Sequence, residues 1–379
     1  KDGWLDGVGS LARSCPMILP TWQCIFLCLG FFAQDAYSLE TVDLIGHESR
    51  CVDVSISPDA TLIASASLDG SLRLWSVRDA KLITILEESE FQANRARFSP
   101  DGRWVAGAFG DGHISLWDTR THKLLQTLEG RSLSIVSLQF SPDGRMLATA
   151  DEDDTPPGQK AEPANEEDWV RIWDVERGIV LHHLADSEDA GGLEYTAHIW
   201  DTASGKLKYA FNEGGLGSLL KFSRDDHTLA FAGGGSDVQL LDLTPAGNHV
   251  VLKTKPLPVC CMEFFPSEKT LLLAGFDRTA RVWEIAPPKK IAELPLEGSP
   301  NFETVKISAD NHIVAALANG DVLLRSGISP HFAEECRKNL KHGQIYCMDV
   351  AQGREMLAVG QIDGEVTIVR WKKAGATGR

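Results

Sequence analysis

Short apolar segments separated by turn residues recur along most of the chain. Residues 46–77 (GHESRCVDVSISPDATLIASASLDGSLRLWSV) hold an apolar segment, a Ser-Pro-Asp turn, a second segment, an Asp-Gly turn and a third segment that ends near Trp75. Residues 91–119 and 134–150 repeat this order around Ser-Pro-Asp-Gly turns. Short strands joined by Pro, Gly and Asp are typical of β-hairpins. The pattern therefore predicts consecutive antiparallel hairpins.

Weaker copies of the pattern follow at residues 219–233, 259–275, 302–318 and 345–360. The place of Trp75 recurs about every 42 residues, at Trp117, Trp173, Trp200, Leu241, Trp283, Arg325 and Val369. With its Gly-His and Trp-Asp marks, this repeat resembles the WD-repeat family over residues 40 to 371. The resemblance implies an all-β fold, a β-propeller of four-stranded blades.

The resemblance also assigns roles to polar residues of the first repeat. In the family, a His before the first strand, a Ser or Thr on the second, an Asp in the next turn and a Trp on the third form a hydrogen-bonded tetrad. The matching residues here are His47, Ser67 (with Ser65 as the alternative), Asp69 and Trp75. Such a set pairs polar groups that would otherwise be buried without partners. No other repeat carries the whole set, because the place of His47 is taken by Ser89, Arg131 and Glu213.

The repeat count leaves two architectures open. Eight third strands are predicted but only seven innermost strands, because just 13 residues (ADSEDAGGLEYTA) separate Leu184 from His198. We expect seven full four-stranded blades and a surplus hairpin, either residues 169–184 or 196–211, with an irregular unit at 185–211. The alternative is eight blades with one incomplete, and a segment lost from the gene model would give the same sequence.

The two ends of the repeat predict how the ring closes. Residues 365–371 (EVTIVRW) form the third strand of the last repeat, and residues 38–45 (SLETVDLI) precede the first. In the family the N-terminal strand completes the last blade, and closure removes free sheet edges. We therefore expect residues 39–371 to form one monomeric propeller, followed by a tail at 372–379.

The N-terminal stretch predicts targeting rather than fold. Residues 14–34 contain no charge and two prolines. Read from Met17, they predict an export signal that ends with cleavage after Ser38, so that residues 1–38 precede the propeller. A membrane anchor and a plain hydrophobic terminus are the alternatives. We favour a periplasmic or secreted location slightly over a cytoplasmic one.

Charge and motifs narrow the function. The formal charge of −16 repels phosphate backbones. Nucleic acid is therefore not an expected partner, and a membrane is one only if residues 14–34 are an anchor. The sequence contains no catalytic set, cofactor motif or metal-ligand spacing that we recognise, so we predict no enzyme activity and no cofactor. The cysteines beyond the N-terminal stretch form no CxxC pair and are predicted to be small buried hydrophobes: Cys51, Cys260, Cys261, Cys336 and Cys347.

An acidic insertion at residues 151–168 interrupts the third repeat. It holds eight acidic residues and one lysine, and it lies between a second and a third strand. The family geometry places that loop on the face of the tetrad His and Asp. We hypothesise that it captures or screens a basic segment of a partner, with an acidic loop that aids solubility as the alternative. The candidate contacts are Arg50, Phe91, Arg131, Asp151, Glu152, Asp153, Asp154, Glu166, Glu167 and Asp168.

Together these features predict a non-catalytic scaffold for protein–protein interaction, which presents loops on one face of the propeller. A first alternative is the sensor or recruiting domain of a larger enzyme whose catalytic part lies upstream of residue 1. An extracellular propeller enzyme is a weaker alternative.

Overall fold

The fold is described from a computed structural model. It describes residues 37–373 apart from the gaps at 130–134, 142, 152–169, 178, 185–195, 202–205, 213–218, 224–226, 233–236, 243–248, 255–258, 268, 296–301, 326–333 and 342. Within these residues there are thirty β-strands and no helix. Neighbouring strands pair antiparallel in every sheet, and they are successive in the chain, as the alternating hairpins predict, except where the first strand joins the last sheet.

Three four-stranded sheets form the first part of the ring. Their strands are β2 (Cys51–Ile56), β3 (Leu62–Ser67), β4 (Ser71–Ser76) and β5 (Lys81–Glu88); β6 (Ala93–Phe98), β7 (Trp104–Phe109), β8 (His113–Asp118) and β9 (Leu124–Glu129); β10 (Ile135–Phe140), β11 (Met146–Asp151), β12 (Val170–Asp174) and β13 (Ile179–Leu184). A two-stranded sheet of β14 (Thr196–Asp201) and β15 (Lys206–Asn212) follows.

Four more four-stranded sheets complete the ring. Their strands are β16 (Leu219–Phe222), β17 (Thr228–Ala232), β18 (Asp237–Asp242) and β19 (His249–Lys253); β20 (Val259–Phe264), β21 (Thr270–Gly275), β22 (Thr279–Ile285) and β23 (Pro288–Pro295); β24 (Phe302–Ile307), β25 (Ile313–Leu317), β26 (Asp321–Arg325) and β27 (Glu334–Asn339); β28 (Ile345–Val350), β29 (Met356–Gln361), β30 (Val366–Lys373) and β1 (Tyr37–Leu44).

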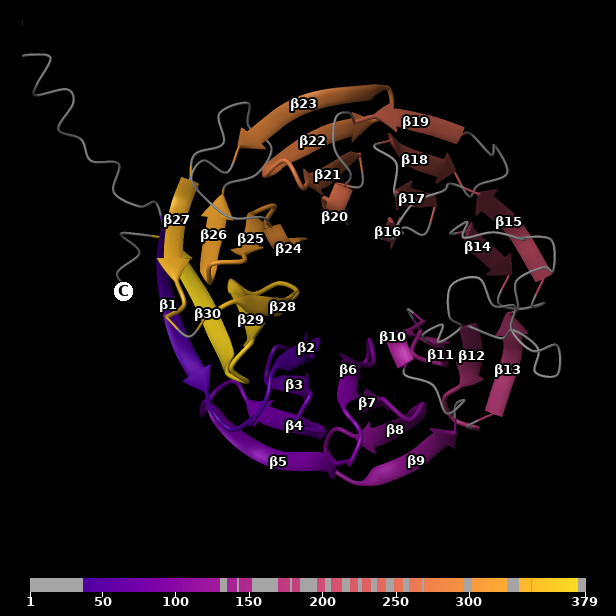
Figure 1. The fold of residues 1–379 in the computed structure, drawn as a ribbon, viewed down its shortest axis with the longest axis vertical. Helices are drawn as coiled ribbons and strands as arrows, with labels where there is room; N and C mark the ends of the chain where they lie inside the picture. Colours follow the sequence, from indigo (N-terminus) through magenta and orange to yellow (C-terminus); the bar gives the residue numbers. More distant parts are fainter. Residues whose placement is uncertain are drawn as a thin grey trace, which may run out of the picture.

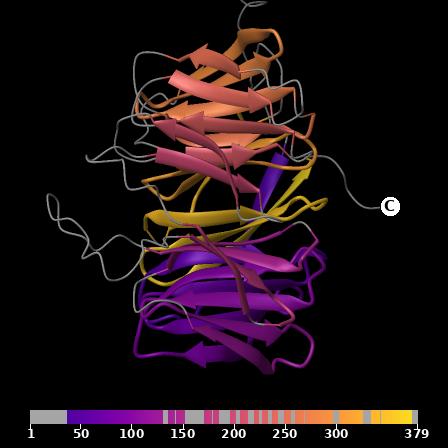
Figure 2. The same cartoon turned by 90° about the vertical axis from the view of Figure 1, so that its right-hand side faces the viewer.

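The sheets stand around a central opening with the first strand of each four-stranded sheet innermost (Figure 1). Seen edge-on, the strands run across the thickness of a disc (Figure 2). This arrangement is a β-propeller, as the repeat predicts.

The Ser-Pro-Asp turns close the hairpin between the first and second strands. The Ser57 hydroxyl donates a 2.7 Å hydrogen bond to Asp59 and accepts one from the amide of Leu62 at 2.9 Å. Ser99 and Asp101 repeat the first contact at 2.6 Å. Because these contacts are local, the turn sequence alone fixes this end of the hairpin.

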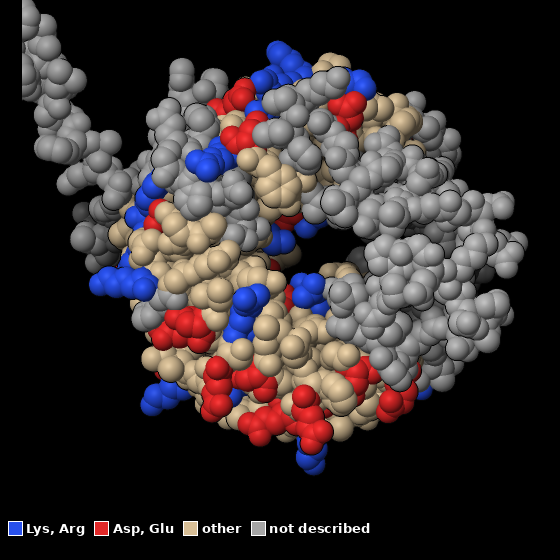
Figure 3. All heavy atoms as spheres, viewed as in Figure 1, with Lys and Arg blue, Asp and Glu red and all other residues tan. Residues whose placement is uncertain are grey.

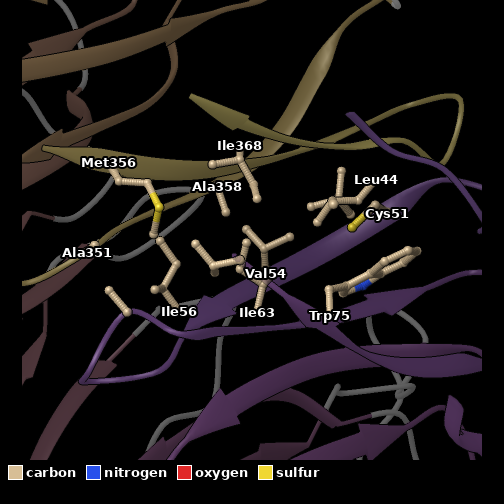
Figure 4. Close-up of a cluster of buried hydrophobic side chains, with 13 residues drawn as sticks. Leu44, Cys51, Val54, Ile56, Ile63, Trp75, Ala351, Met356, Ala358 and Ile368 are labelled. Carbon is tan, nitrogen blue, oxygen red and sulfur yellow. The ribbon is translucent and has the colours of Figure 1, made fainter. Parts of the chain in front are cut away.

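The core lies between neighbouring sheets rather than at the ring centre. The cluster drawn in Figure 4 joins the sheet β2–β5 to the sheet of β28, β29, β30 and β1, and it includes the buried side chains of Trp75, Ile63, Met356 and Ile368. Comparable clusters join the other neighbouring four-stranded sheets among the described residues. Each four-stranded sheet that stands between two others is thus buried on both faces, which accounts for the near-continuous apolar strands.

The N-terminal strand closes the ring, which confirms the expected closure. β1 pairs antiparallel with β30 from Tyr37 opposite Lys373 to Leu44 opposite Val366. β1 lies beside β30 although the two are at opposite ends of the sequence (Figure 1). The edge of β30 is covered over its whole length, and no partner strand from another molecule is needed.

The hairpin β14–β15 forms a sheet of its own and does not extend the sheet β10–β13. It lies between β13 and β19 in the outer part of the ring (Figure 1). The described residues therefore give seven four-stranded sheets and one two-stranded sheet. The choice between seven blades with a surplus hairpin and eight blades with one incomplete stays a prediction.

Most of the N-terminal segment predicted at residues 1–38 lies outside the described residues, as do most of the tail at 372–379 and residues 185–195 of the irregular unit. Tyr37 and Ser38 belong to β1. Within the described part of the chain there is no helix of the length and apolar character that a membrane crossing requires.

Gly70 offers a test of the turn between β3 and β4. Its φ is +83°, and a Cβ there would lie 2.1 Å from the carbonyl oxygen of Ser89. Gly70→Ala should lower the free energy of unfolding by about 2 to 4 kcal/mol, because a left-handed residue and a backbone clash are combined. Gly353→Ala is the matched control, since φ is +74° but a Cβ there would meet nothing within 4 Å; we expect a loss of about 1 kcal/mol. Equal losses in urea denaturation would contradict the role of the clash.

Candidate partner-binding face

A chain of hydrogen bonds joins the loop before β2 to β3, β4 and the turn between them. The Trp75 indole N–H donates to the Ser65 hydroxyl at 2.8 Å, and Ser65 Oγ lies 2.7 Å from His47 Nε2. His47 Nδ1 lies 3.0 Å from Asp69 Oδ2. If Nδ1 carries the proton, every donor in this chain meets an acceptor: indole to hydroxyl, hydroxyl to imidazole, imidazole to carboxylate. Because each group is paired, the set is stable although His47 and Ser65 are buried.

The hydroxyl in this chain is Ser65, so the preferred assignment of Ser67 was wrong. Ser67 Oγ instead donates to the backbone carbonyl of Ser49 at 3.0 Å and accepts from the amide of Asp69. The register explains the difference. Trp75 pairs with Ile63, so its diagonal neighbour on the same face is Ser65, whereas Ser67 lies beyond its reach.

The pKa values of His47 and Asp69 keep this set of hydrogen-bonded side chains in one protonation state. Burial lowers the pKa of His47 and outweighs the opposing effect of Asp69. Burial alone would raise the pKa of Asp69, but hydrogen bonds from His47 and Ser71 and from two backbone amides lower it overall. A neutral imidazole and an ionised carboxylate at neutral pH follow.

The other sheets with a tryptophan at the position of Trp75 have fewer of these hydrogen bonds. Trp173 donates to the Thr149 hydroxyl at 3.1 Å. The indole N–H groups of Trp117 and Trp283 are buried and have no hydrogen-bond partner among the described residues. The residues that match Ser65 in their sheets are Gly107 and Leu273, which have no hydroxyl. The complete chain of hydrogen bonds is thus found once in the described structure.

His47 and Asp69 define one face of the ring. Because each sheet is a meander, the loops before the innermost strands and the turns between second and third strands emerge at the same end. We call this end the loop face. The outermost strand of each sheet, such as β5, β9 or β19, lies at the rim (Figure 1).

The exposed large apolar side chains of the described residues fall into two groups. Those of the loop face are Ile45, Phe91, Phe276, Tyr346 and Ile362, with exposed fractions from 39% to 74%. Those of the rim are Leu82, Ile83, Leu124, Leu125 and Val251. The loop-face group carries three aromatic rings and the rim group none, and aromatic residues are enriched at protein interfaces.

Arg50 and Tyr346 link the first and last sheets on the loop face. The Arg50 guanidinium carbon lies 4.8 Å from the centre of the Tyr346 ring, which is cation–π geometry. The amide of Ile362 donates to the carbonyl of Gln344 at 3.0 Å, which holds Ile362 in the neighbouring turn. Arg50 and Tyr346 are therefore positioned before any partner arrives.

The structure places only some of the sequence candidates. Arg50 and Phe91 lie on the loop face, in the loops before β2 and β6. Asp151 is the last residue of β11. The remaining candidates lie outside the described residues: Arg131, Glu152, Asp153, Asp154, Glu166, Glu167 and Asp168.

Acidic side chains surround the apolar residues of the loop face. Glu48, Glu88, Glu90 and Asp363 are exposed in its loops and strand ends. Figure 3 shows acidic side chains gathered over the sheets β2–β5 and β6–β9, with Lys and Arg side chains beside the central opening. Acidic side chains are therefore concentrated on this part of the described surface.

Sequence reasoning missed a ring of polar side chains on the innermost strands. One residue of each innermost strand, at a fixed distance from the following turn, contributes to this inner ring: Ser55, Arg97, Gln139, Lys221, Glu263, Lys306 and Asp349. The signal was in the sequence, as a polar residue between two apolar ones just before every turn. In the sequence, a single polar residue at this position looks like one that faces solvent. Only the closed ring shows that these residues lie close to one another.

The inner ring ties neighbouring sheets to one another. Glu263 pairs with Lys221 at 2.5 Å and with Lys306 at 3.5 Å, and Arg97 pairs with Asp53. Asp349 Oδ2 accepts from the amide of Ile56 at 2.8 Å.

Burial shifts the pKa values of charged side chains in the inner ring. Burial raises the pKa of Asp349, and burial together with the charge of Lys306 lowers that of Lys221. Among the described residues no three His, Cys, Asp or Glu side chains gather in a way that would hold a metal ion. We assign the inner ring to the closure of the propeller, because its contacts join adjacent innermost strands.

Comparison with known proteins agrees with the repeat. The family model "WD domain, G-beta repeat" matches residues 38–76 and 248–284. The model "Eukaryotic translation initiation factor eIF2A" matches residues 62–155.

Two curated relatives match parts of the chain. "Ribosome assembly protein 4" of Chaetomium thermophilum is 52% identical over 40 residues, which are 11% of this chain and 8% of the relative. "NACHT domain- and WD repeat-containing protein 1" of Homo sapiens is 21% identical over 222 residues, 50% of this chain and 14% of the relative. The chain thus spans a small part of the length of either relative.

The two ranges that match the repeat model contain strands in the same order. Residues 38–76 cover the outermost strand β1 and then β2 to β4, and residues 248–284 cover β19 and then β20 to β22. Each range therefore contains an outer strand followed by three strands of the next sheet, and the same order continues around the ring. Over these two ranges the chain thus carries WD repeats, and its sheets are arranged as a β-propeller.

Proposed function

We propose that this protein is a non-catalytic scaffold that binds a protein partner through its loop face. The observation that carries the proposal is the Arg50–Tyr346 pair, with Phe91 and Ile362 exposed on the same face. WD-repeat domains generally mediate protein–protein interaction, and the matched repeat model supports this role. The alternatives of an enzyme-linked recruiting domain or a propeller enzyme stay predictions.

The partner would present a basic segment that also carries apolar side chains. Exposed Glu48, Glu88, Glu90 and Asp363 lie among the apolar residues of the loop face, and the acidic insertion at 151–168 is predicted to lie on the same face. Opposite charge would speed the encounter and fix its orientation, and the apolar contacts would supply most of the affinity.

Rigidity gives the scaffold its advantage. The described loops beside β2 and β6 are short and are anchored by backbone hydrogen bonds such as Leu68 N to Arg50 O at 3.0 Å and Ser89 N to Gly70 O at 3.0 Å. A surface that is already ordered loses little conformational entropy when a partner binds. The fold thus acts by holding contacts in place.

Affinity purification with matched variants tests the proposal. The face variant carries Phe91→Ser and Tyr346→Ser, and the rim variant carries Leu124→Ser and Leu125→Ser, which have similar exposed fractions of 45% to 50%. We expect the face variant to lose a specific partner by tenfold or more while the rim variant retains it. Equal retention by both variants, or loss only with the rim variant, would overturn the proposal.

Deletion of residues 152–167 tests the acidic insertion separately. If the insertion captures a basic segment, the deleted chain should bind the partner more weakly at low salt and show a smaller dependence of affinity on salt, because the loop charges act over about 8 to 10 Å at physiological ionic strength. Unchanged affinity and unchanged salt dependence would leave the insertion with the solubility role alone.

A further inference from the structure

Two thiols, one from the first sheet and one from the last, lie next to each other where the ring closes. Cys51 begins β2, and Cys347 lies on β28, the adjacent innermost strand. A Cβ built on Gly360 would lie 2.5 Å from the sulfur of Cys347 and 2.7 Å from that of Cys51. Both sulfurs therefore occupy the space that a side chain at residue 360 would need. Cys347 Sγ also lies 3.8 Å from the carbonyl oxygen of Cys51.

The glycine at this position is specific to the closing sheet. Gly360 pairs with Cys347 in the register of β28 and β29. In the six other four-stranded sheets of the described structure, the matching position holds alanine: Ala66, Ala108, Ala150, Ala232, Ala274 and Ala316. The missing methyl group leaves room for the second sulfur at the one junction that joins the first and last sheets.

The two thiols differ in access. The side chain of Cys51 is fully buried and lies in the cluster of Figure 4, whereas Cys347 is partly exposed. Both are free thiols. Burial and the neighbouring Cys51 raise the pKa of Cys347, so little thiolate forms at neutral pH and reaction is slow.

We infer that Cys51 and Cys347 are a modification site, a dithiol that a peroxide oxidises to a disulfide. The peroxide transfers one oxygen to the sulfur of Cys347 and gives a sulfenic acid and water. The Cys51 sulfur then attacks that sulfur, an S–S bond forms, and the sulfenic oxygen leaves as a second water. Two thiols and one hydrogen peroxide thus give one disulfide and two waters.

The disulfide adds a covalent closure to the hydrogen-bonded one between β1 and β30. It joins residues 296 positions apart in sequence, so it restricts the unfolded chain strongly. The residues directly before the two cysteines are Arg50 and Tyr346, which form the cation–π pair of the loop face. Oxidation would therefore hold the two sheets together beneath that pair, and it does not depend on any partner.

Peptide mapping of the whole chain tests the inference. The protein is treated with hydrogen peroxide, its remaining thiols are alkylated, and it is digested with trypsin without reduction. Cys51 lies in the tryptic fragment 51–73 and Cys347 in fragment 342–354. We expect these two fragments to be disulfide-linked after oxidation and separate after dithiothreitol. Recovery of both fragments only in alkylated or singly oxidised form would overturn the inference.

Variants and unfolding give independent readouts. Cys51→Ser and Gly360→Ala should abolish the linked fragment, and Cys336→Ser, which removes a buried thiol elsewhere, should leave it unchanged. The oxidised wild-type chain should unfold about 5 °C or more above the reduced one, and the Cys51→Ser chain should show no such difference. If Cys51→Ser does not fold, the wild-type fragment map and Cys336→Ser still decide the question.

Discussion

Trp75→Ala is expected to lower the free energy of unfolding by about 3 to 5 kcal/mol. Trp75 is 1% exposed and packs between the first and last sheets, so its removal leaves a cavity that the neighbouring strands cannot fill. The substitution also removes the donor to Ser65 and weakens the chain of hydrogen bonds that ends at Asp69. Urea denaturation followed by circular dichroism measures the loss.

Two further variants separate packing from hydrogen bonding. Trp75→Phe keeps much of the ring volume and removes the N–H, and Ser65→Ala removes the hydroxyl; each should cost about 1 to 3 kcal/mol. Ser67→Ala should cost less than Ser65→Ala, because Ser67 lies outside the chain. A larger loss for Ser67→Ala than for Ser65→Ala would contradict the assignment.

A chain that begins at Ile45, and so lacks β1, is expected to lose most of its stability, which for a domain amounts to roughly 5 to 15 kcal/mol. The truncation exposes the full edge of β30 and removes the buried side chain of Leu44. It also leaves the Thr367 hydroxyl without its acceptor Asp43, at 2.8 Å in the intact chain. Thermal unfolding and size-exclusion chromatography should show a low midpoint and aggregation through the open edge.

The control for this truncation is a chain that begins at Tyr37, which keeps all of β1. Its unfolding midpoint should stay near that of the full chain. Similar stability of the chains that begin at Tyr37 and at Ile45 would show that β1 does not close the ring.

Features that depend on neighbouring residues could be predicted from the sequence. The hairpins follow from alternation and from turns such as Ser57 to Asp59, whose contacts are local. The hairpin predictions succeeded because periodicity and turn chemistry act over a few residues. The closure by β1 is a distant contact, and it was expected from the resemblance to the WD-repeat family, in which the N-terminal strand completes the last blade.

Features that depend on register or on distant contacts could not be predicted in the same way. Ser65 and Ser67 lie on the same face of one strand, and only the pairing of β3 with β4 decides between them. Arg97 pairs with Asp53 and Cys347 meets Cys51 across neighbouring sheets. Such partners are dozens to hundreds of residues apart, and a single sequence carries no signal of which residues will meet.

The loop face as the binding surface is tested most directly by hydroxyl-radical footprinting of the protein with and without a partner recovered by affinity purification. We predict that Phe91, Tyr346 and Ile362 are protected in the complex and that Leu124 and Leu125 on the rim react as before. Protection confined to Leu124, Leu125 and their neighbours, with Phe91 and Tyr346 unchanged, would contradict the account.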